Sequence, residues 1–380
     1  MKLAPLATAL MLALAGCGGN DAVLKPVPLT DIRSQVGVDS DWKVGSEGAR
    51  SDSAERFRPY LDESFAYLAG HDGSVSAVAL DNGKQAWETG LDVPLLRGVS
   101  GDASRVYVTT LDGEVIALGK AEGEVLWRQS FSSEVLAAPA ASPSMLVVRT
   151  NDGYIYGLSP DDGSEVWRQQ FQVPVLTVQG YATPLIVPGG VLTGLDDGTV
   201  VALSLTDGRL IWRTQVARPD GRSEIDRLVD VDGPLSIDQQ YIYAASYQGQ
   251  LVRIEPQQGR ISWSTPVSST TGVSTNADKA FVSTSESHVL AVDKQSGAVL
   301  WETAALEGRH LTRPVPVEGA VIVGDLEGYI HWLDEDNGEL IGRYRLDNSP
   351  VMAAPVVRDD AIYLLSRDGV LRKISAKALD

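Results

Sequence analysis

Glycines recur ten residues apart along most of this chain. The complete pairs are Gly73/Gly83, Gly113/Gly123, Gly153/Gly163, Gly198/Gly208, Gly249/Gly259 and Gly328/Gly338. In most copies a tryptophan follows four residues after the second glycine, at Trp87, Trp127, Trp167, Trp212 and Trp263. Another copy has Ser287 in place of the first glycine, followed by Gly297 and Trp301. Self-similarity with a period of roughly 40 residues indicates a repeat architecture.

Residues 145–168 show which strands one repeat is expected to form. Two apolar stretches flank Asp152-Gly153, and a second turn at Asp162-Gly163 leads into a stretch that ends with Trp167. Asp-Gly between apolar runs predicts a tight hairpin, because glycine adopts positive φ without a Cβ clash. Two such turns join three antiparallel strands, and residues 137–142 supply a fourth. Four strands in roughly 40–45 residues predict a blade of a β-propeller.

The number of first turns gives the number of blades. These turns are centred at residues 73, 113, 153, 198, 249, 287, 328 and 369, which predicts eight blades. The last copy runs out of chain before its outer strand. Trp42 precedes Gly73 by 31 residues, within the range of 24 to 37 seen between later tryptophans and the next first turn. We therefore expect residues around Asp41–Val44 to form the outer strand of blade eight and to close the ring.

The repeated tryptophans have two readings, as scaffold or as part of a ligand site. The sequence favours scaffold, because a large aromatic at one place in every outer strand can pack between neighbouring blades. The copies resemble PQQ-type propeller repeats, as in residues 112–127, DGEVIALGKAEGEVLW. They lack the Gly-His and Trp-Asp signatures of WD40 repeats. The predicted fold class is all-β, an eight-bladed propeller of four-stranded antiparallel blades.

The N-terminus predicts export. Residues 1–16 contain one lysine and a short apolar run ending in Leu14-Ala15-Gly16, which is typical of a signal peptide. The next residue, Cys17, is the only cysteine, and Leu-Ala-Gly-Cys resembles a bacterial lipobox. This resemblance implies lipidation of Cys17, and Gly18 after it suggests sorting to the outer membrane. The alternative is an ordinary signal peptide followed by a chance cysteine. We expect residues 17–30 to form an extended tether and residues 31–380 to form the propeller.

Composition and motifs argue against several function classes. The formal net charge of −18 is unfavourable for binding nucleic acid or anionic lipid. The four histidines, at positions 71, 288, 310 and 331, do not have the spacing of a metal motif. No P-loop, G-x-S-x-G or G-x-G-x-x-G motif is present. We therefore predict no enzyme activity and no cofactor.

Two consecutive connections are longer than the others. Four of the six distances from a tryptophan to the next first turn are 24–27 residues, whereas those between blades three and four and between blades four and five are 31 and 37. Connections of one type lie on one face of a propeller, so we expect these two to be neighbours. They contain residues 173–180 (VPVLTVQG) and 224–232 (EIDRLVDVD). Long loops on a rigid scaffold commonly carry binding sites.

Three readings of this loop pair remain open from the residues alone. Apolar side chains beside clustered carboxylates favour a site for a protein partner. The second reading is a pair of surface loops with solvated acids. The third is a cation site, because Asp-x-Asp supplies hard oxygen ligands.

Two further segments carry a more specific resemblance. Residues 223–232 (SEIDRLVDVD) and 324–332 (GDLEGYIHW), together with the lipobox and the eight repeats, resemble the BamB family, formerly called YfgL. Members are lipoproteins of the outer-membrane β-barrel assembly machinery. The resemblance implies a non-enzymatic scaffold on the periplasmic face of the outer membrane that assists the folding and insertion of β-barrel proteins.

The resemblance also implies a partner and a set of contact residues. The partner is BamA, bound through its POTRA domains, and unfolded outer-membrane proteins are a further candidate partner through β-augmentation of blade edges. The implied contacts are Leu176, Val178 and Gln179 in the first loop and Asp230 and Asp232 in the second. Gln179 departs from the family pattern, in which an arginine commonly stands there.

Two alternative functions remain beside this one. The first is a periplasmic oxidoreductase that uses PQQ, since such enzymes share the fold. They typically carry an adjacent cysteine pair at the cofactor, and this chain has only Cys17. The second is a scaffold of an unrelated envelope complex.

Overall fold

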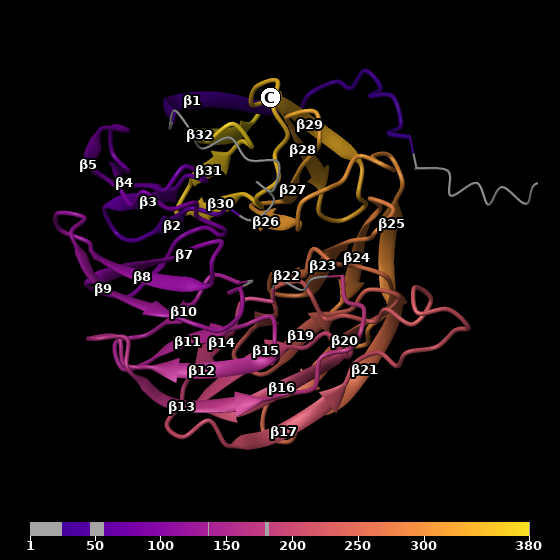
Figure 1. The fold of residues 1–380 in the computed structure, drawn as a ribbon. Coiled ribbons are helices and arrows are strands. Elements are labelled where there is room, and N and C mark those ends of the chain that lie inside the picture. The colour runs from indigo at the N-terminus through magenta and orange to yellow at the C-terminus, as the bar shows by residue number, and fades with distance from the viewer. Residues whose placement is uncertain (1–24, 46–56, 136, 179–181, 380) are drawn as a thin grey trace, which may run out of the picture.

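Eight four-stranded sheets stand around a common centre as the blades of a propeller (Figure 1). The computed structural model describes residues 25–45, 57–135, 137–178 and 182–379, and every regular element in those ranges is a β-strand. Neighbouring strands pair antiparallel, and in blades one to seven the order in the sheet is the order along the chain. Over the described ranges, no helix is long and apolar enough to cross a membrane. The predicted fold class is confirmed.

The strands of the first four blades are as follows. Blade one contains β2 (Tyr60–Leu61), β3 (Phe65–Ala69), β4 (Ser74–Ala79) and β5 (Gln85–Gly90). Blade two contains β6 (Ser100–Gly101), β7 (Arg105–Thr109), β8 (Glu114–Gly119) and β9 (Val125–Ser130). Blade three contains β10 (Ala140–Ala141), β11 (Leu146–Arg149), β12 (Tyr154–Leu158) and β13 (Glu165–Gln170). Blade four contains β14 (Leu185–Val187), β15 (Gly190–Gly194), β16 (Thr199–Ser204) and β17 (Leu210–Gln215).

The strands of the last four blades follow the same plan. Blade five contains β18 (Ser236–Ile237), β19 (Ile242–Ala245), β20 (Gly249–Glu255) and β21 (Arg260–Val267). Blade six contains β22 (Val273–Thr275), β23 (Lys279–Ser283), β24 (Val289–Asp293) and β25 (Val299–Thr303). Blade seven contains β26 (Val315–Val317), β27 (Ala320–Gly324), β28 (Tyr329–Asp334) and β29 (Leu340–Arg345). Blade eight contains β30 (Val356–Arg358), β31 (Ala361–Leu365), β32 (Val370–Ala378) and β1 (Val36–Gly45).

The tryptophan pattern joins each blade to the next. The indole of Trp127 packs against Gly163 in the second turn of blade three, where a Cβ would lie 2.7 Å from the ring. Its N–H donates to the carbonyl of Pro160 at 2.9 Å. Gly163 also has φ of 73°, so both its conformation and its missing side chain are needed. The same pairing recurs for Trp42, Trp87, Trp167, Trp212, Trp263 and Trp301. The prediction that these residues are scaffold is confirmed.

We expect Trp127→Ala to lower the free energy of unfolding by about 3–5 kcal/mol, because it removes a buried aromatic side chain and leaves a cavity between blades two and three. Urea denaturation followed by circular dichroism measures the change. The matched control is Val125→Ala, which truncates an exposed side chain of the same strand. It should lower the free energy of unfolding by less than about 1 kcal/mol. Similar losses for the two variants would contradict the inter-blade role.

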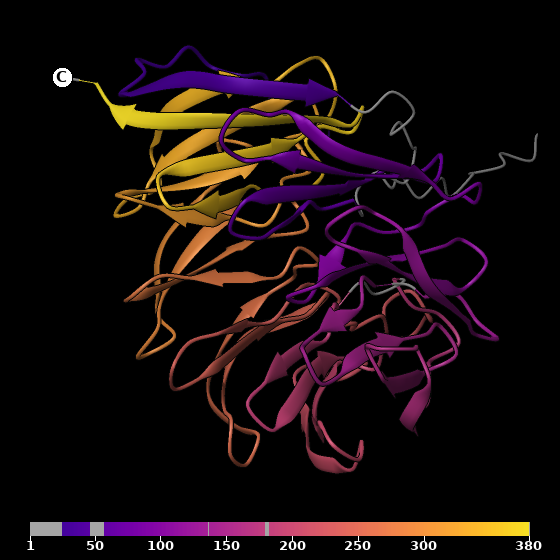
Figure 2. The same ribbon diagram turned by 90° about the vertical axis from the view of Figure 1, so that its left-hand side faces the viewer.

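The N-terminal strand β1 closes the ring. It pairs antiparallel with β32 from Val36↔Ala378 to Gly45↔Val370, and Figures 1 and 2 show these two strands side by side in one blade. The register shifts immediately before Trp42, as it does before the tryptophan of the other outer strands. The predicted closing strand at residues 41–44 is confirmed, and it extends over ten residues.

The joint between blades seven and eight explains why the seventh repeat lacks a tryptophan. Gly342 occupies the tryptophan position in β29, and a Cβ there would lie 2.9 Å from the Val36 side chain. The amide of Gln35 donates to the carbonyl of Ile341 at 2.7 Å. The start of the closing strand therefore fills the space that a tryptophan occupies elsewhere.

The segment before β1 lies against blades six and seven. Arg309, which is fully buried, donates to the carbonyl of Val27 at 2.9 Å, and Arg343 donates to that of Thr30 at 3.0 Å. Leu29 packs against the core between the same blades. Residues 25–30 of the expected tether are thus held by the ring. The rest of that tether, the predicted signal peptide and Cys17 lie outside the described residues.

Candidate functional site

The connection between β13 and β14 exposes apolar side chains. Val175 is 93% exposed and Leu176 is 46% exposed. Val178, further along, is half-buried, and its amide is directed at the next connection. Gln179, the third contact residue that the family resemblance implies for this loop, lies outside the described residues. The first loop therefore presents Val175 and Leu176 to solvent while its end is held.

The connection between β17 and β18 folds back on itself as a braced turn. The Ser223 amide donates to the Asp226 carboxylate, and the Asp226 amide donates to the Ser223 hydroxyl, both at 3.1 Å. The amide of Leu228 donates to the carbonyl of Ile225 at 3.3 Å. This bracing leaves Ile225 66% exposed at the tip of the turn. This side chain adds to the exposed apolar surface of the two loops.

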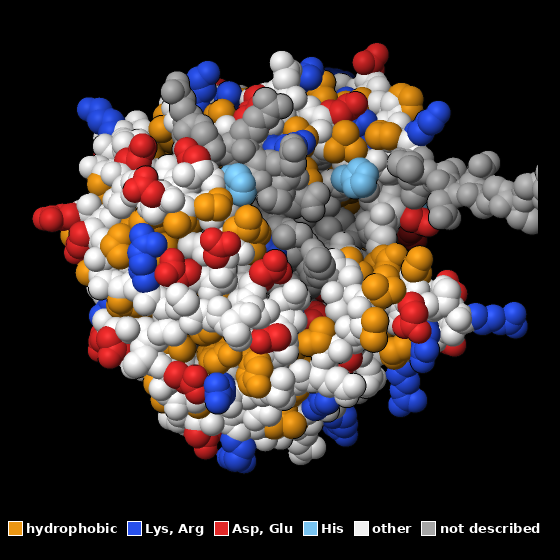
Figure 3. Space-filling model, in the orientation of Figure 1, with side chains coloured by type: hydrophobic (Ala, Val, Ile, Leu, Met, Phe, Trp, Pro, Cys, Tyr) orange, Lys and Arg blue, Asp and Glu red, His pale blue; other side chains and the backbone are white. Residues whose placement is uncertain are grey.

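The two long connections meet, as their adjacent positions predicted. The amide of Val178 donates to Oδ2 of Asp230 at 2.5 Å, which joins the first loop to the second. Gln248, in the first turn of blade five, donates to the carbonyl of Ile225 at 3.4 Å. Figure 3 looks onto this face, where hydrophobic and acidic side chains alternate over blades three to five. We call Val175, Leu176 and Ile225 the apolar loop patch.

The placement of Asp230 and Asp232 differs from the expectation. Direct contact with a partner would require both carboxylates to reach solvent, but Asp230 is 0% and Asp232 3% exposed. The cause is local. The amide of Val231, between them, donates to the carbonyl of Leu195 at 3.2 Å, and the amide of Tyr247 donates to that of Asp230 at 2.9 Å. These hydrogen bonds hold the end of the second loop beneath the first turns of blades four and five.

Two residues that the sequence reading missed complete this buried cluster. Asp196 lies in the first turn of blade four, directly after β15, and one oxygen from each of Asp196, Asp230 and Asp232 lies within 4.8 Å of the other two. Arg149, at the end of β11, pairs with Asp196 and donates to the carbonyl of Gly194 at 3.1 Å. A signal existed for Asp196. It is the only aspartate that stands two residues before a first-turn glycine in this chain.

Burial shifts the acidity of the two loop carboxyl groups. Burial, together with the charges of Asp230 and Asp196, raises the pKa of Asp232 to about 8, and Arg149 opposes them. Burial also raises the pKa of Asp230 to about 6, against the hydrogen bond from the Val178 amide. The ionised forms are therefore less stable in the folded protein than in the unfolded chain.

With no cation bound, the free energy of unfolding should fall as the pH rises from about 4 to about 8. The folded protein holds a proton on Asp232 that the unfolded chain releases near its ordinary pKa, so each pH unit in this window costs up to about 1.4 kcal/mol. Urea denaturation at a series of pH values in chelator-treated buffer measures the slope. Asp232→Asn should flatten it. An unchanged slope in that variant would show that another group titrates.

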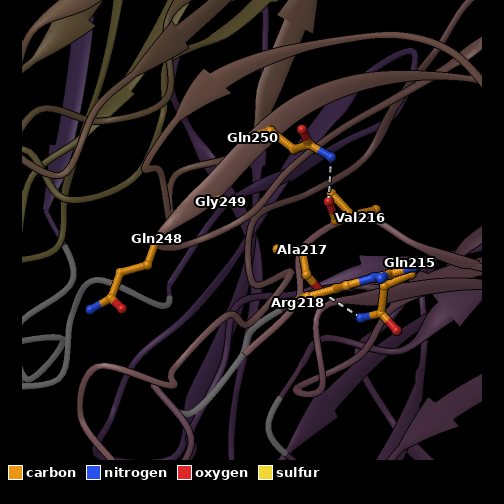
Figure 4. A pocket seen from close by; sticks show the side chains of 7 residues that line it. All are labelled: Gln215, Val216, Ala217, Arg218, Gln248, Gly249 and Gln250. Atoms are coloured by element: carbon orange, nitrogen blue, oxygen red, sulfur yellow. Dashed lines mark hydrogen bonds between the residues drawn. The ribbon is translucent and has the colours of Figure 1, made fainter. Parts of the chain in front are cut away.

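A hollow of about 410 Å³ opens beside the second loop. It lies between the end of β17 and the first turn of blade five, and Figure 4 labels its lining residues, Gln215, Val216, Ala217, Arg218, Gln248, Gly249 and Gln250. Gln250 donates to the carbonyl of Val216 at 2.6 Å, and Gln248 points away from the other side chains. The lining carries amide, guanidinium and small apolar groups but no carboxylate, thiol or hydroxyl. The hollow therefore adds hydrogen-bonding groups beside the apolar loop patch.

The fold and its repeats define an eight-bladed β-propeller of PQQ-like repeats, with two adjoining long loops on one face. The model of a protein family described as outer membrane protein assembly factor BamB matches residues 71–303 and 285–380. The chain belongs to this family, and the predicted resemblance is confirmed.

Relatives and solved structures agree with this assignment. The chain is 43% identical over 364 residues to the outer membrane protein assembly factor BamB of Pseudomonas aeruginosa, with 96% of each protein covered. It is 46% identical over 346 residues to that of Marinobacter adhaerens, covering 91% of this chain and 89% of the relative. The crystal structure of BamB from Moraxella catarrhalis superposes with a TM-score of 0.82 at 30% identity, covering 89% of this chain and 100% of that one.

A redox enzyme shares the architecture. Quinohemoprotein alcohol dehydrogenase from Comamonas testosteroni matches with a TM-score of 0.71 at 14% identity, covering 89% of this chain and 76% of the enzyme. At this identity the likeness shows the fold alone.

Proposed function

We propose that this chain is a non-enzymatic lipoprotein scaffold of the outer-membrane β-barrel assembly machinery. It binds the POTRA domains of BamA and thereby assists the folding and insertion of β-barrel proteins. The observation that carries the proposal is the apolar loop patch. Val175, Leu176 and Ile225 are exposed on two loops that are tied together by the Val178–Asp230 hydrogen bond. Apolar anchors surrounded by polar groups are the usual energetic centre of a protein interface.

The predicted contact residues take different roles in this proposal. Leu176 is exposed and makes direct contact with the partner, while Val178 is half-buried at the edge of the patch. Asp230 and Asp232 act from beneath, because Asp230 holds the Val178 amide and fixes the first loop against the second. Gln179 follows directly in the chain and completes the set expected from the family pattern.

The described part of the N-terminal segment lies away from this site. Val27 and Thr30 are held at blades six and seven, whereas the apolar loop patch belongs to the connections among blades three, four and five. Blade five and the rest of blade six separate the two along the ring. The ring can therefore be held by lipid on one sector and bind a partner on another. Its function is to recruit and orient BamA.

An affinity purification tests the proposed function. The full-length tagged chain should retain BamA when it is isolated from detergent-solubilised envelopes of its own host. The absence of BamA from the eluate, with another envelope complex recovered in its place, would reject the proposed partner.

Lipid anchoring at Cys17 has a separate consequence. Cys17→Ala removes the only thiol of the chain, so the variant should lose acylation and leave the outer-membrane fraction. Cys17→Ala is combined with Leu176→Ser and Ile225→Ser, so that binding to BamA does not hold the protein at the membrane. Membrane fractionation of cells that produce this combined variant measures the effect. Retention of Cys17→Ala in the outer membrane of those cells would contradict anchoring by lipid.

A further inference from the structure

The buried carboxylates of the two loops form a compact cluster with Asp196. Asp196 comes from the first turn of blade four, and Asp230 and Asp232 come from the connection to blade five. One oxygen of each lies within 4.8 Å of the other two. Two oxygens bound to one Ca²⁺ at about 2.4 Å are at most about 4.8 Å apart, so each pair of these oxygens lies within the spacing that a shared ion allows.

Two oxygens of the cluster have no hydrogen-bond partner among the residues that the structure describes. They are Oδ1 of Asp230 and Oδ1 of Asp232, and both residues are at least 97% buried. Buried carboxylate oxygens are normally paired, because an unpaired one loses its hydration without compensation. Something that donates positive charge is therefore required at this place.

Asp325 in blade seven shows how the same fold satisfies a buried carboxylate. It is equally buried, yet it accepts from Arg309 and His331 at 2.8 Å and from the amides of Glu327 and Tyr329 at 2.9 Å. At the loop cluster, Asp230 accepts a hydrogen bond from the Val178 amide, and its other oxygen has no partner among the described residues. Asp230 and Asp232 are therefore the buried carboxylates of this cluster that lack compensating hydrogen bonds.

The charge balance identifies the kind of ligand. The charged groups that act on Asp232 are Asp230, Asp196 and Arg149. Arg149 is already engaged by Asp196 and by the Gly194 carbonyl. When all three carboxyl groups are ionised, they and the guanidinium leave two negative charges, which one divalent cation neutralises in place of the bound proton.

We propose that Asp196, Asp230 and Asp232 bind one hard divalent cation, with Ca²⁺ preferred over Mg²⁺. The cluster offers only oxygen ligands, which suit Ca²⁺ and Mg²⁺ and not the softer metals that select histidine or cysteine. The ligands lie on loop segments, and Ca²⁺ tolerates the irregular geometry that such segments provide better than Mg²⁺ does. The remaining coordination positions of Ca²⁺ are filled by second carboxylate oxygens, backbone carbonyls and water.

Cation binding would stabilise the arrangement of both long loops. Asp230 ligates the ion through one oxygen and holds the Val178 amide through the other, so the ion fixes the first loop through Asp230. Asp196 extends this connection to the first turn of blade four and, through Arg149, to blade three. The inference stands on the buried cluster alone and is independent of which partner the apolar loop patch binds.

The test uses the full-length protein, treated with chelator, dialysed, and titrated calorimetrically with CaCl₂ at pH 7.5 in 0.15 M KCl. We expect one Ca²⁺ bound per chain, an increase of the melting temperature on binding, and binding of Mg²⁺ at least tenfold weaker. Asp232→Asn should weaken Ca²⁺ binding at least tenfold, and because it removes a repelling buried charge it should still fold. A matched control is Asp161→Asn with Asp162→Asn, in the exposed second turn of blade three, which should bind Ca²⁺ as the unmodified chain does.

Three results would overturn the inference. The first is no binding at millimolar Ca²⁺ or Mg²⁺, which would mean that the cluster is neutralised by protons. The second is undiminished binding in Asp232→Asn. The third is an equal loss in the control variant, which would assign the binding to the general negative charge of the surface.

Discussion

Removal of the closing strand should destabilise the ring more than any other short deletion. Deletion of residues 17–45 removes β1, its antiparallel pairing with β32, and Trp42, whose N–H donates to the Leu80 carbonyl of blade one at 3.1 Å. It exposes Leu371 and Ile374 of β32, which are fully buried. Truncation of a buried aromatic side chain costs about 3–5 kcal/mol, and here a partly buried tryptophan is lost together with a whole strand. We expect the melting temperature to fall by roughly 10 °C or more.

The control for this deletion ends before the ring begins. Deletion of residues 17–24 leaves the contacts of Val27 and Thr30 with Arg309 and Arg343 in place. Its melting temperature should match that of the unlipidated full-length domain within about 2 °C. Thermal unfolding followed by circular dichroism compares the two deletions. Equal melting temperatures would contradict closure of the ring by β1.

The fold could be predicted because the repeat carries two kinds of information at once. Gly163, for example, marks a local turn through its positive φ and also marks the docking site of Trp127 from the preceding blade. Local and inter-blade requirements fall on the same few residues, so their spacing alone gives the blades and their number. Trp42 identified the closing strand for the same reason, since it repeats the docking contact on Gly83.

The site could be predicted only in part. Loop length located the two neighbouring connections, but the burial of Asp230 and Asp232 depends on where the second loop folds back. Val229 and Val231 alternate with these aspartates, and all four side chains are buried, so the sequence pattern distinguishes no exposed face. The contact of Arg309 with Val27 joins residues 282 positions apart, and no local pattern reports it. Residues 25–30 of the expected tether therefore lie against the ring, which no local pattern indicates.

Replacement of the apolar loop patch should have the largest effect on partner binding. Leu176→Ser combined with Ile225→Ser removes two exposed anchors from adjoining loops and leaves the buried cluster beneath them unchanged. Truncation of an interface anchor commonly costs over 1 kcal/mol, and about 1.4 kcal/mol corresponds to a tenfold change in affinity. We therefore expect BamA binding to weaken by roughly tenfold or more. The fold should be unaffected, because neither side chain belongs to an inter-blade core.

The chain offers a closely matched control for this variant. Leu126 and Val166 are 44% and 53% exposed, similar to Leu176 at 46%, but they lie on the outer strands β9 and β13. Leu126→Ser with Val166→Ser removes comparable apolar surface from the rim of the propeller. Any difference between the two double variants therefore reflects position and not hydrophobicity.

The most direct measurement is a calorimetric titration of the purified chain with the purified POTRA domains of BamA. The unmodified chain and the Leu126→Ser/Val166→Ser control should bind with the same Kd, and the Leu176→Ser/Ile225→Ser variant should bind at least tenfold more weakly. All three proteins should have the same circular dichroism spectrum. If the unmodified chain does not bind the POTRA domains, or if the correctly folded loop variant binds them as tightly as the control, this chain does not act on BamA through the apolar loop patch.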